Sequence, residues 1–306
     1  MMAVLLRRYN RTEVTIISYM RYIYIFFLVI ISLASFGQKK DTKLQKQIIQ
    51  LIENFNGDIG IYVHDLKHNK IVSINADSVF PTASIVKIPI LIGVMSKIQA
   101  GELNYHQRLT YTDSLFYNEG DDILSAFKDS ATIELSKVMM LMLTISDNCA
   151  SLWLQGLSGG GTRINQLLDS FKLTATRVNS RTPGRENNRN AYGWGQTSPR
   201  EMATLMEGIV DGEIINKESS EKMLRLLGRQ YWDEVALSQI PADVFVADKN
   251  GAVDESRNEV MYVNSKNNPY ILSIFTKKNK DTSWVSGNEA WVLTRKISAL
   301  LWKYYN

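Results

Sequence analysis

The chain has 306 residues, 45% of them hydrophobic and 22% charged, which is the composition of a globular protein large enough for one sizeable domain or two packed lobes. The formal net charge is +4, but residues 1–37 hold four arginines and one acid. The remaining chain has 31 basic and 30 acidic residues, a balance of +1. This near-neutral balance argues against nucleic acid as a partner.

The amino-terminal residues have the pattern of an export signal. Arg21 precedes an apolar run over residues 22–33, and small residues lead up to Gly37. We expect cleavage after Gly37 (a signal peptide over 1–37) and a periplasmic or secreted product. The alternative is an uncleaved membrane anchor, since more apolar residues lie upstream of Arg21, although the run itself is short for a span. Residues 1–19 are candidates for an over-extended start.

Cysteine and histidine are scarce. Cys149 is the single cysteine, which leaves no intramolecular disulfide, and the histidines are His64, His68 and His106. His64 and His68 have an i,i+4 spacing, but that part of the chain is expected to be strand and turn, and no Cys/His cluster accompanies them. We therefore expect neither a metal nor another cofactor.

Hydrophobic periodicity places sheet-forming segments at both ends of the chain and helices between them. Helical spacing predicts an amphipathic helix over residues 42–55, and alternation predicts strands at 59–63 and around 72–74. Patterning over residues 102–230 is mostly helical, most clearly at 133–145.

Strands are predicted again at residues 244–248, 259–263 and 270–275, and a final helix is predicted to begin with a capping box, Ser286 to Glu289. The terminal segments can form one antiparallel sheet flanked by terminal helices. We therefore expect an α/β (α+β) fold in which an all-helical lobe is inserted into an α/β lobe. The expected bounds are 38–80 and 231–306 for the α/β lobe and 81–230 for the helical lobe.

The first candidate for catalysis is Ser84, three residues before Lys87. At the start of a helix these side chains share one face, and a lysine with a lowered pKa can accept the serine proton. The ordinary alternative is a buried helix whose serine caps it and whose lysine reaches solvent. Because Ser-x-x-Lys also occurs at Ser125 and Ser219, the spacing alone is weak.

Two further motifs follow in the chain. Ser146-Asp147-Asn148 comes after the clearest predicted helix; it is either a turn or a set of groups that relays a proton, braces a loop and binds an amide. Lys249-Asn250-Gly251 follows the predicted strand at 244–248. The lysine is either a solvated charge or part of a groove in which the glycine lets backbone approach a ligand.

These motifs, in this order, resemble the signature set of the penicillin-recognising serine hydrolases, and most closely that of class A β-lactamases. Glu186-Asn-Asn-Arg-Asn190 resembles the Glu-x-x-x-Asn of that family, and residues 198–200 resemble the end of its omega loop. The resemblance extends over about residues 42–304. It implies a β-lactamase/transpeptidase-like fold and a serine hydrolase that needs no metal.

The resemblance also implies a role for each matching residue. Ser84 would form the acyl-enzyme, with an oxyanion hole from the backbone N–H groups of Ser84 and Ala252, and Lys87 would take or relay the serine proton. Ser146 would protonate the leaving nitrogen. Glu186, held by Asn190, would activate the hydrolytic water.

Substrate contacts are implied as well. Asn148 would bind the side-chain amide of the substrate, and Lys249 and Asn250 would face its carboxylate beside Gly251. Arg257 resembles a second carboxylate anchor of some relatives, although an ordinary surface arginine is equally compatible with the sequence.

The match departs from the family pattern at three points. Asn250 replaces the usual threonine or serine, the loop from Glu186 to Arg200 is shorter, and Gly195 stands where an aspartate is normal. Tyr192 and Trp194 could pack the shortened loop instead. Because the loop is shorter, the sequence leaves open whether Glu186 reaches the hydrolytic water.

Three functions follow from these alternatives. A monomeric β-lactamase acting on small-molecule β-lactams is favoured if Glu186 is in place. Without it, the protein would be a penicillin-binding D,D-peptidase-like hydrolase acting on D-Ala-D-Ala peptides, or a cell-envelope domain that binds β-lactams without turnover. Ser146-Asp147-Asn148 argues against a glutaminase of the same fold.

Overall fold

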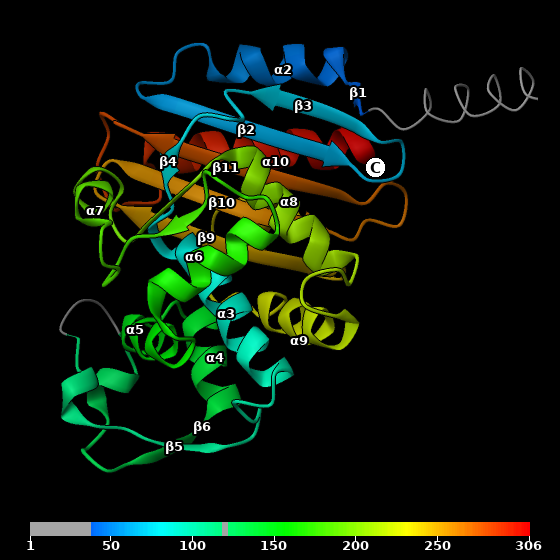
Figure 1. The fold of residues 1–306 in the computed structure, drawn as a ribbon. Helices are drawn as coiled ribbons and strands as arrows, with labels where there is room; N and C mark the ends of the chain where they lie inside the picture. Colours follow the sequence, from blue (N-terminus) through cyan, green and yellow to red (C-terminus); the bar gives the residue numbers. More distant parts are fainter. Residues whose placement is uncertain (1–37, 118–121) are drawn as a thin grey trace, which may run out of the picture. The chain divides into compact units, whose positions relative to one another are not determined.

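The computed structural model describes residues 38–117 and 122–306 (Figure 1). The expected export signal and its cleavage site lie outside these residues. The chain divides into a unit of residues 1–39 and a unit of residues 40–306. The second unit contains the sheets and helices of the fold, and the short strand β1 (Lys39–Lys40) spans the division in sequence. Among the described residues, no helix has the length and apolar character needed to cross a bilayer.

The main sheet of residues 40–306 is antiparallel and joins both ends of the chain. Its strands lie in the order β3-β2-β11-β10-β9. They are β2 (Asp58–Asp65), β3 (Lys70–Ile74), β9 (Val246–Val253), β10 (Ser256–Val263) and β11 (Tyr270–Lys277). The alternating segments at 59–63, 72–74, 259–263 and 270–275 are strands as predicted.

Strand β9 differs from its prediction in a way that affects the site. We expected a strand at residues 244–248 followed by Lys249, but β9 continues to Val253 and includes Lys249, Asn250 and Gly251. The polar Asp-Lys-Asn run has no apolar alternation to predict it. The strand persists because β10 pairs with it throughout, with Glu259 opposite Asn250.

One face of the sheet is covered by the two terminal helices. They are α2 (Thr42–Ile52) and α10 (Glu289–Tyr305), and their apolar faces pack with those of the strands, for example Leu44 and Ile297 with Leu272, all fully buried. Helix α2 ends at Ile52, earlier than predicted. The predicted cap of α10 is also wrong: Asn288, not Ser286, caps the helix, and its Oδ1 accepts the N–H of Ala290 at 3.1 Å.

The other face of the sheet meets the helical part of the chain. Helix α8 (Pro199–Val210) contacts β2, β10 and β11, and Figure 1 shows it on the side of the sheet opposite α10. It belongs spatially with the sheet although it precedes residue 230, so the lobe bounds at 80 and 230 remain a prediction. Farther from the sheet, helix α3 (Lys87–Gln99) is surrounded by four helices. It contacts α4 (Leu135–Thr144), α5 (Asn148–Leu157), α6 (Gly160–Ser170) and α9 (Lys217–Leu227). The residues of α3 from Lys87 to Met95 are all buried.

The remaining elements are short or surround α3. The helices are α4 (Leu135–Thr144), α5 (Asn148–Leu157), α6 (Gly160–Ser170), α7 (Glu186–Tyr192) and α9 (Lys217–Leu227). The 3₁₀ turns are η1 (Ala83–Val86), η2 (Asp113–Leu115), η3 (Leu124–Ala126) and η4 (Leu237–Gln239). One small sheet consists of β4 (Phe80–Pro81), β8 (Gly195–Thr197) and β7 (Arg177–Val178), and the other of β5 (Arg108–Thr110) and β6 (Thr132–Glu134).

Candidate active site

Ser84 and Lys87 meet where η1 passes into α3. Ser84 lies in the 3₁₀ turn and Lys87 is the first residue of the α-helix. A spacing of three residues puts side chains on one face in either kind of helix. The structure places Lys87 Nζ 3.0 Å from Ser84 Oγ. The pairing predicted from the spacing is therefore present, although the turn that carries it is tighter than expected.

Lys87 is fully buried and does not reach solvent. Its ammonium nitrogen also lies within hydrogen-bond distance of the Ser146 carbonyl, of Ser146 Oγ (3.0 Å) and of Asn148 Oδ1 (2.9 Å). Burial, followed by the charge of Lys249, lowers the pKa of Lys87 well below its ordinary value, against the opposing effect of two nearby aspartates. A neutral amine is therefore accessible, and it can accept the proton of the Ser84 hydroxyl.

The Ser146-Asp147-Asn148 loop is held by its central carboxylate. Asp147 caps α5, accepting the N–H of Ala150 at 2.8 Å, and its second oxygen accepts the N–H of Leu124 at 3.0 Å. Ser146 has a left-handed backbone, with φ of 65°. The carboxylate thus braces the loop, as the motif predicts, and the loop presents Ser146 and Asn148 to Lys87.

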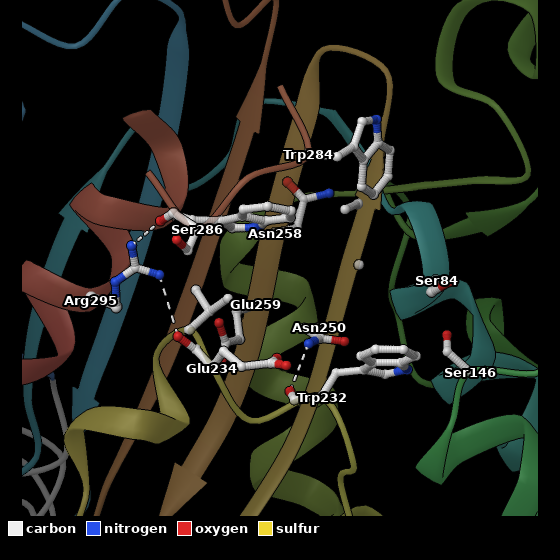
Figure 2. A pocket seen from close by; sticks show the side chains of 14 residues that line it. Ser84, Ser146, Trp232, Glu234, Asn250, Asn258, Glu259, Trp284, Ser286 and Arg295 are labelled. Atoms are coloured by element: carbon white, nitrogen blue, oxygen red, sulfur yellow. Dashed lines mark hydrogen bonds between the residues drawn. The ribbon is translucent and has the colours of Figure 1, made fainter. Parts of the chain in front are cut away.

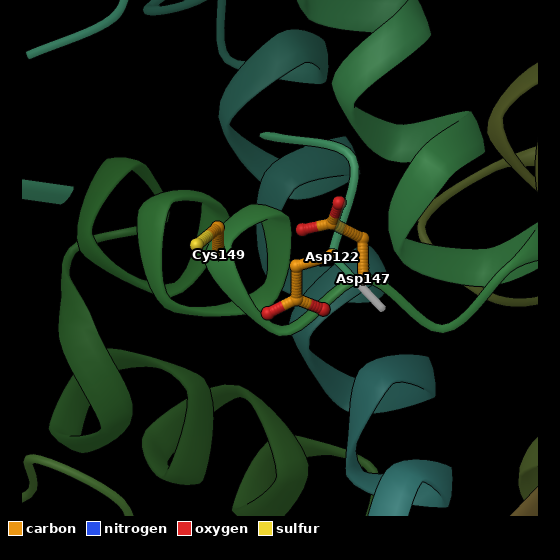
Figure 3. A group of neighbouring side chains, drawn as sticks. All are labelled: Asp122, Asp147 and Cys149. Atoms are coloured by element: carbon orange, nitrogen blue, oxygen red, sulfur yellow. The ribbon is translucent and has the colours of Figure 1, made fainter. Parts of the chain in front are cut away.

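Asp147 belongs to a buried group with Asp122 and Cys149, whose ligand-type atoms lie within 4.8 Å of one another (Figure 3). Asp122 accepts the N–H of Asn148 at 2.7 Å, and the Cys149 sulfur accepts that of Tyr117 at 3.2 Å. Burial raises the pKa of the Cys149 thiol to about 11, so the thiolate that metals bind is disfavoured. The group acts as a brace beneath the loop, and the expectation of no metal remains a prediction.

Gly251 brings β9 against the nucleophile. A Cβ at this position would lie 2.8 Å from the Ser84 nitrogen and 2.8 Å from the Thr82 carbonyl oxygen. Only glycine therefore allows this approach. Next to it, Ala252 lines the same pocket as Ser84. The oxyanion-hole role of the Ser84 and Ala252 N–H groups stays a prediction, and this close approach is the geometry it requires.

Lys249 and Asn250 are linked to each other and to the pocket wall. Lys249 is fully buried; its Nζ donates to the Asn250 carbonyl at 2.9 Å and lies 3.3 Å from Asn250 Oδ1. Asn250 Nδ2 donates to the Trp232 carbonyl at 2.9 Å. Burial lowers the pKa of Lys249 to about 8, against the effect of Asp248 and Glu259. Asn250 thus holds a fixed position in the pocket, where its amide can replace the usual hydroxyl.

Glu186 is not among the residues that line the pocket at Ser84. It begins α7, is exposed, and its Oε1 accepts the N–H of Gly184 at 3.1 Å. Asn190, expected to hold it, is exposed too and lines a different hollow, against the β9–β10 hairpin. The role of Glu186 as the base for the hydrolytic water therefore stays a prediction.

Arg257 is not a surface arginine, and it is not among the residues that line the pocket. It is 1% exposed, and its guanidinium donates to the carbonyls of Asp254 (2.8 Å) and Thr282 (3.1 Å), among others. The same group stacks 4.5 Å from the Trp284 ring and 5.1 Å from the Trp291 ring. The surface-arginine alternative is wrong, because the side chain packs under two tryptophans that are far away in sequence, while its role as a second carboxylate anchor stays a prediction.

The pocket of about 530 Å³ that opens at Ser84 extends beyond the motif residues (Figure 2). Its further lining residues include Trp232, Trp284, Trp291 and Arg295. Sequence reasoning missed these four residues because no motif marks them. Three come from loops or a helix end that only the tertiary fold brings to β9.

A serine beside a buried lysine of lowered pKa, with a second serine on the lysine's other side, defines a Ser–Lys acyl-transfer site. Residues 43–305 match the model of the β-lactamase enzyme family, and the chain belongs to this family. The fold class and the resemblance to class A enzymes are thereby confirmed.

The relatives are distant but extend over most of the chain. β-Lactamase VEB-1 of Pseudomonas aeruginosa is 23% identical over 292 residues, covering 92% of this chain and 95% of its own. An imipenem-hydrolyzing β-lactamase of Enterobacter cloacae is 28% identical over 269 residues, covering 84% and 88%.

Solved structures agree on the fold. A point mutant of PBP-A, in an acyl-enzyme complex with penicillin G, superposes with a TM-score of 0.77 at 27% identity, covering 88% of this chain and 98% of its own. A β-lactamase from Chitinophaga pinensis also has a TM-score of 0.77, at 19% identity, covering 87% and 100%.

Proposed function

We propose that the protein is a serine β-lactamase that opens the lactam amide through an acyl-enzyme on Ser84. The observation that carries this proposal is the fully buried Lys87, whose Nζ lies 3.0 Å from Ser84 Oγ and 3.0 Å from Ser146 Oγ. A relay of this kind can take a proton at one serine and return it at the other. The family and its β-lactamase relatives support the same activity.

In the proposed reaction, Ser84 Oγ attacks the lactam carbonyl carbon while its proton passes to the neutral amine of Lys87. The carbonyl C–N bond breaks, and the proton travels through Ser146 to the departing nitrogen. Water then attacks the ester, which frees Ser84 and leaves a ring-opened acid. Asn148 would bind the substrate amide, and Lys249 with Asn250 its carboxylate.

A second candidate is a penicillin-binding hydrolase or binding domain whose acyl-enzyme is long-lived. The exposure of Glu186 favours it, because the water that ends the cycle then lacks its expected base. The similarity to PBP-A, seen as an acyl-enzyme with penicillin G, adds support. Its natural substrate would be a D-Ala-D-Ala-type peptide.

Export to the periplasm or medium, a part in antibiotic resistance and a monomeric state belong to the same proposal. Sequencing the amino terminus of the secreted product tests the cleavage after Gly37, and a mature start well upstream would overturn it.

Mass spectrometry of the protein mixed with nitrocefin or benzylpenicillin, with hydrolysis followed in parallel, separates the two functions. Fast turnover with a transient adduct supports the β-lactamase, whereas a persistent adduct supports the second candidate. Ser84→Ala should form no adduct, and persistent labelling of that variant would refute the nucleophile.

A further inference from the structure

The pocket at Ser84 has an aromatic lining that acylation of Ser84 does not require. Trp232 and Trp284 both line the space into which Ser84 and Ser146 open (Figure 2). A third tryptophan, Trp291, lies behind Trp284, with ring centroids 6.0 Å apart at 70°.

Trp284 is held by Arg257 and Trp291 but is largely exposed. The buried Arg257 guanidinium lies 4.5 Å from its ring, and backbone carbonyls of the same loop hold that guanidinium in place. Yet 64% of Trp284 is exposed. Such exposure of a large apolar side chain in a pocket is typical of a binding surface. The indole is thus positioned in advance, with one face held and much of its surface open.

Trp232 is fixed in a comparable way. Its Nε1 donates to the Ile145 carbonyl at 3.0 Å, and its own carbonyl accepts the amide of Asn250. It therefore borders Asn250, the residue expected to meet the substrate carboxylate. A substituent attached next to that carboxylate would enter the space that Trp232 and Trp284 line.

Resting on the proposed function, we propose that Trp284 and Trp232 form a recognition site for an aromatic substituent on the carboxylate side of the β-lactam. In cephalosporins this substituent is carried on C3, next to the carboxylate-bearing carbon. Trp284 is the specificity-determining residue, because planar groups stack well on an exposed, immobilised indole. Its contribution is to substrate binding rather than to the proton transfers at Ser84.

The test compares Trp284→Ala with the parent protein on two cephalosporins, nitrocefin, which has an aromatic group on C3, and cephalexin, which has a methyl group there. We expect KM for nitrocefin to rise about tenfold while KM for cephalexin changes less than about twofold, a difference of the size that one aromatic contact supplies. If turnover is slow, the second-order acylation rate replaces KM.

Two controls keep the result interpretable. Val285→Ala removes a neighbouring side chain that is 61% exposed but does not line the pocket, and it should leave both substrates unchanged. Trp284→Phe keeps an aromatic ring and should restore most of the nitrocefin affinity. Equal losses on both cephalosporins, or no loss on either, would overturn the inference. If the parent protein reacted with neither nitrocefin nor cephalexin, the proposed function itself would be refuted.

Discussion

Replacing Lys87 by methionine separates its chemical role from its burial. Methionine fills a similar volume but has no amine, so Ser84 loses the base 3.0 Å from its oxygen. Positioned acid–base groups typically contribute about 10²–10⁴-fold, and we expect acylation by a fluorescent penicillin to slow by that factor. Labelling at the parent rate would refute the assignment of Lys87 as the base.

The same substitution has a predictable effect on stability. The pKa of Lys87 is lowered from 10.5 by burial, so between the folded pKa and 10.5 the unfolded chain binds more protons than the folded one. Stability of the parent therefore rises with pH through that window, and below it the full cost of burying the charge is present, about 1.4 kcal/mol for each unit of lowering. Methionine lacks this cost.

The stability of Lys87→Met relative to the parent should thus be most favourable below the folded pKa of Lys87 and decline as the pH rises from there toward 10.5. Denaturant unfolding at several pH values measures this difference. Lys296→Met, at an exposed position of α10, is the control and should show no such trend. A difference for Lys87→Met that is independent of pH would show that the amine is not held in the low-pKa state described above.

Three further predictions concern the surroundings of the nucleophile. Gly251→Ala should slow acylation about 100-fold, because the new Cβ would displace the backbone of Ser84; labelling rates measure this, and Gly287→Ala, where nothing lies within 4 Å, is the matched control. Arg257→Ala should lower the free energy of unfolding by about 2–4 kcal/mol, since it leaves buried carbonyls without donors; an unchanged denaturation midpoint would contradict this. Glu186→Gln should change the rate of adduct loss less than about twofold, because the carboxylate faces Gly184; a large slowing of that rate would show that Glu186 reaches the site during turnover.

The parts of the site that sequence could predict depend on local spacing. Ser84 and Lys87 are about one turn apart in either a 3₁₀ or an α-helix. Their pairing could therefore be predicted although Ser84 lies in a 3₁₀ turn rather than in the α-helix. Asp147 next to a helix start is a cap by local chemistry. The sheet strands were similarly accessible because alternation reflects the burial of one face.

The features that the sequence did not predict depend on contacts between segments that are far apart in the chain. The strand position of Arg257 was foreseeable, but its stack between Trp284 and Trp291 requires the β11–α10 loop to fold over β10. The extension of β9 through Lys249 likewise depends on pairing with β10, which no local pattern encodes. The position of Trp232 in the pocket was not predictable either, because it depends on long-range hydrogen bonds with Asn250 and Ile145.

The neck of the shortened loop is packed too closely for the aspartate that the family pattern has there. Gly195 lets β8 lie against the start of η1, since a Cβ there would be 2.6 Å from both Thr82 Oγ1 and Val86 Cγ2. An aspartate at this position could not fit. The neck of the loop is closed instead by backbone contacts: the Gly195 carbonyl accepts the N–H of Thr82 at 2.9 Å, and the carbonyl of Trp194 accepts that of Asn179 at 2.8 Å.

In this loop Glu186 is exposed and accepts the N–H of Gly184, while the groups proposed for acylation lie on backbone that neighbouring elements hold. The Ser84 turn is pinned by β9 and β8, and Lys87 is enclosed by the Ser146 loop. Ser84, Lys87 and Ser146 are thus already within hydrogen-bond distance of one another through Lys87 Nζ, whereas Glu186 does not line the pocket at Ser84. On this geometry, loss of the acyl group is the step on which the β-lactamase and the long-lived acyl-enzyme proposals differ, and the rate of adduct loss decides between them.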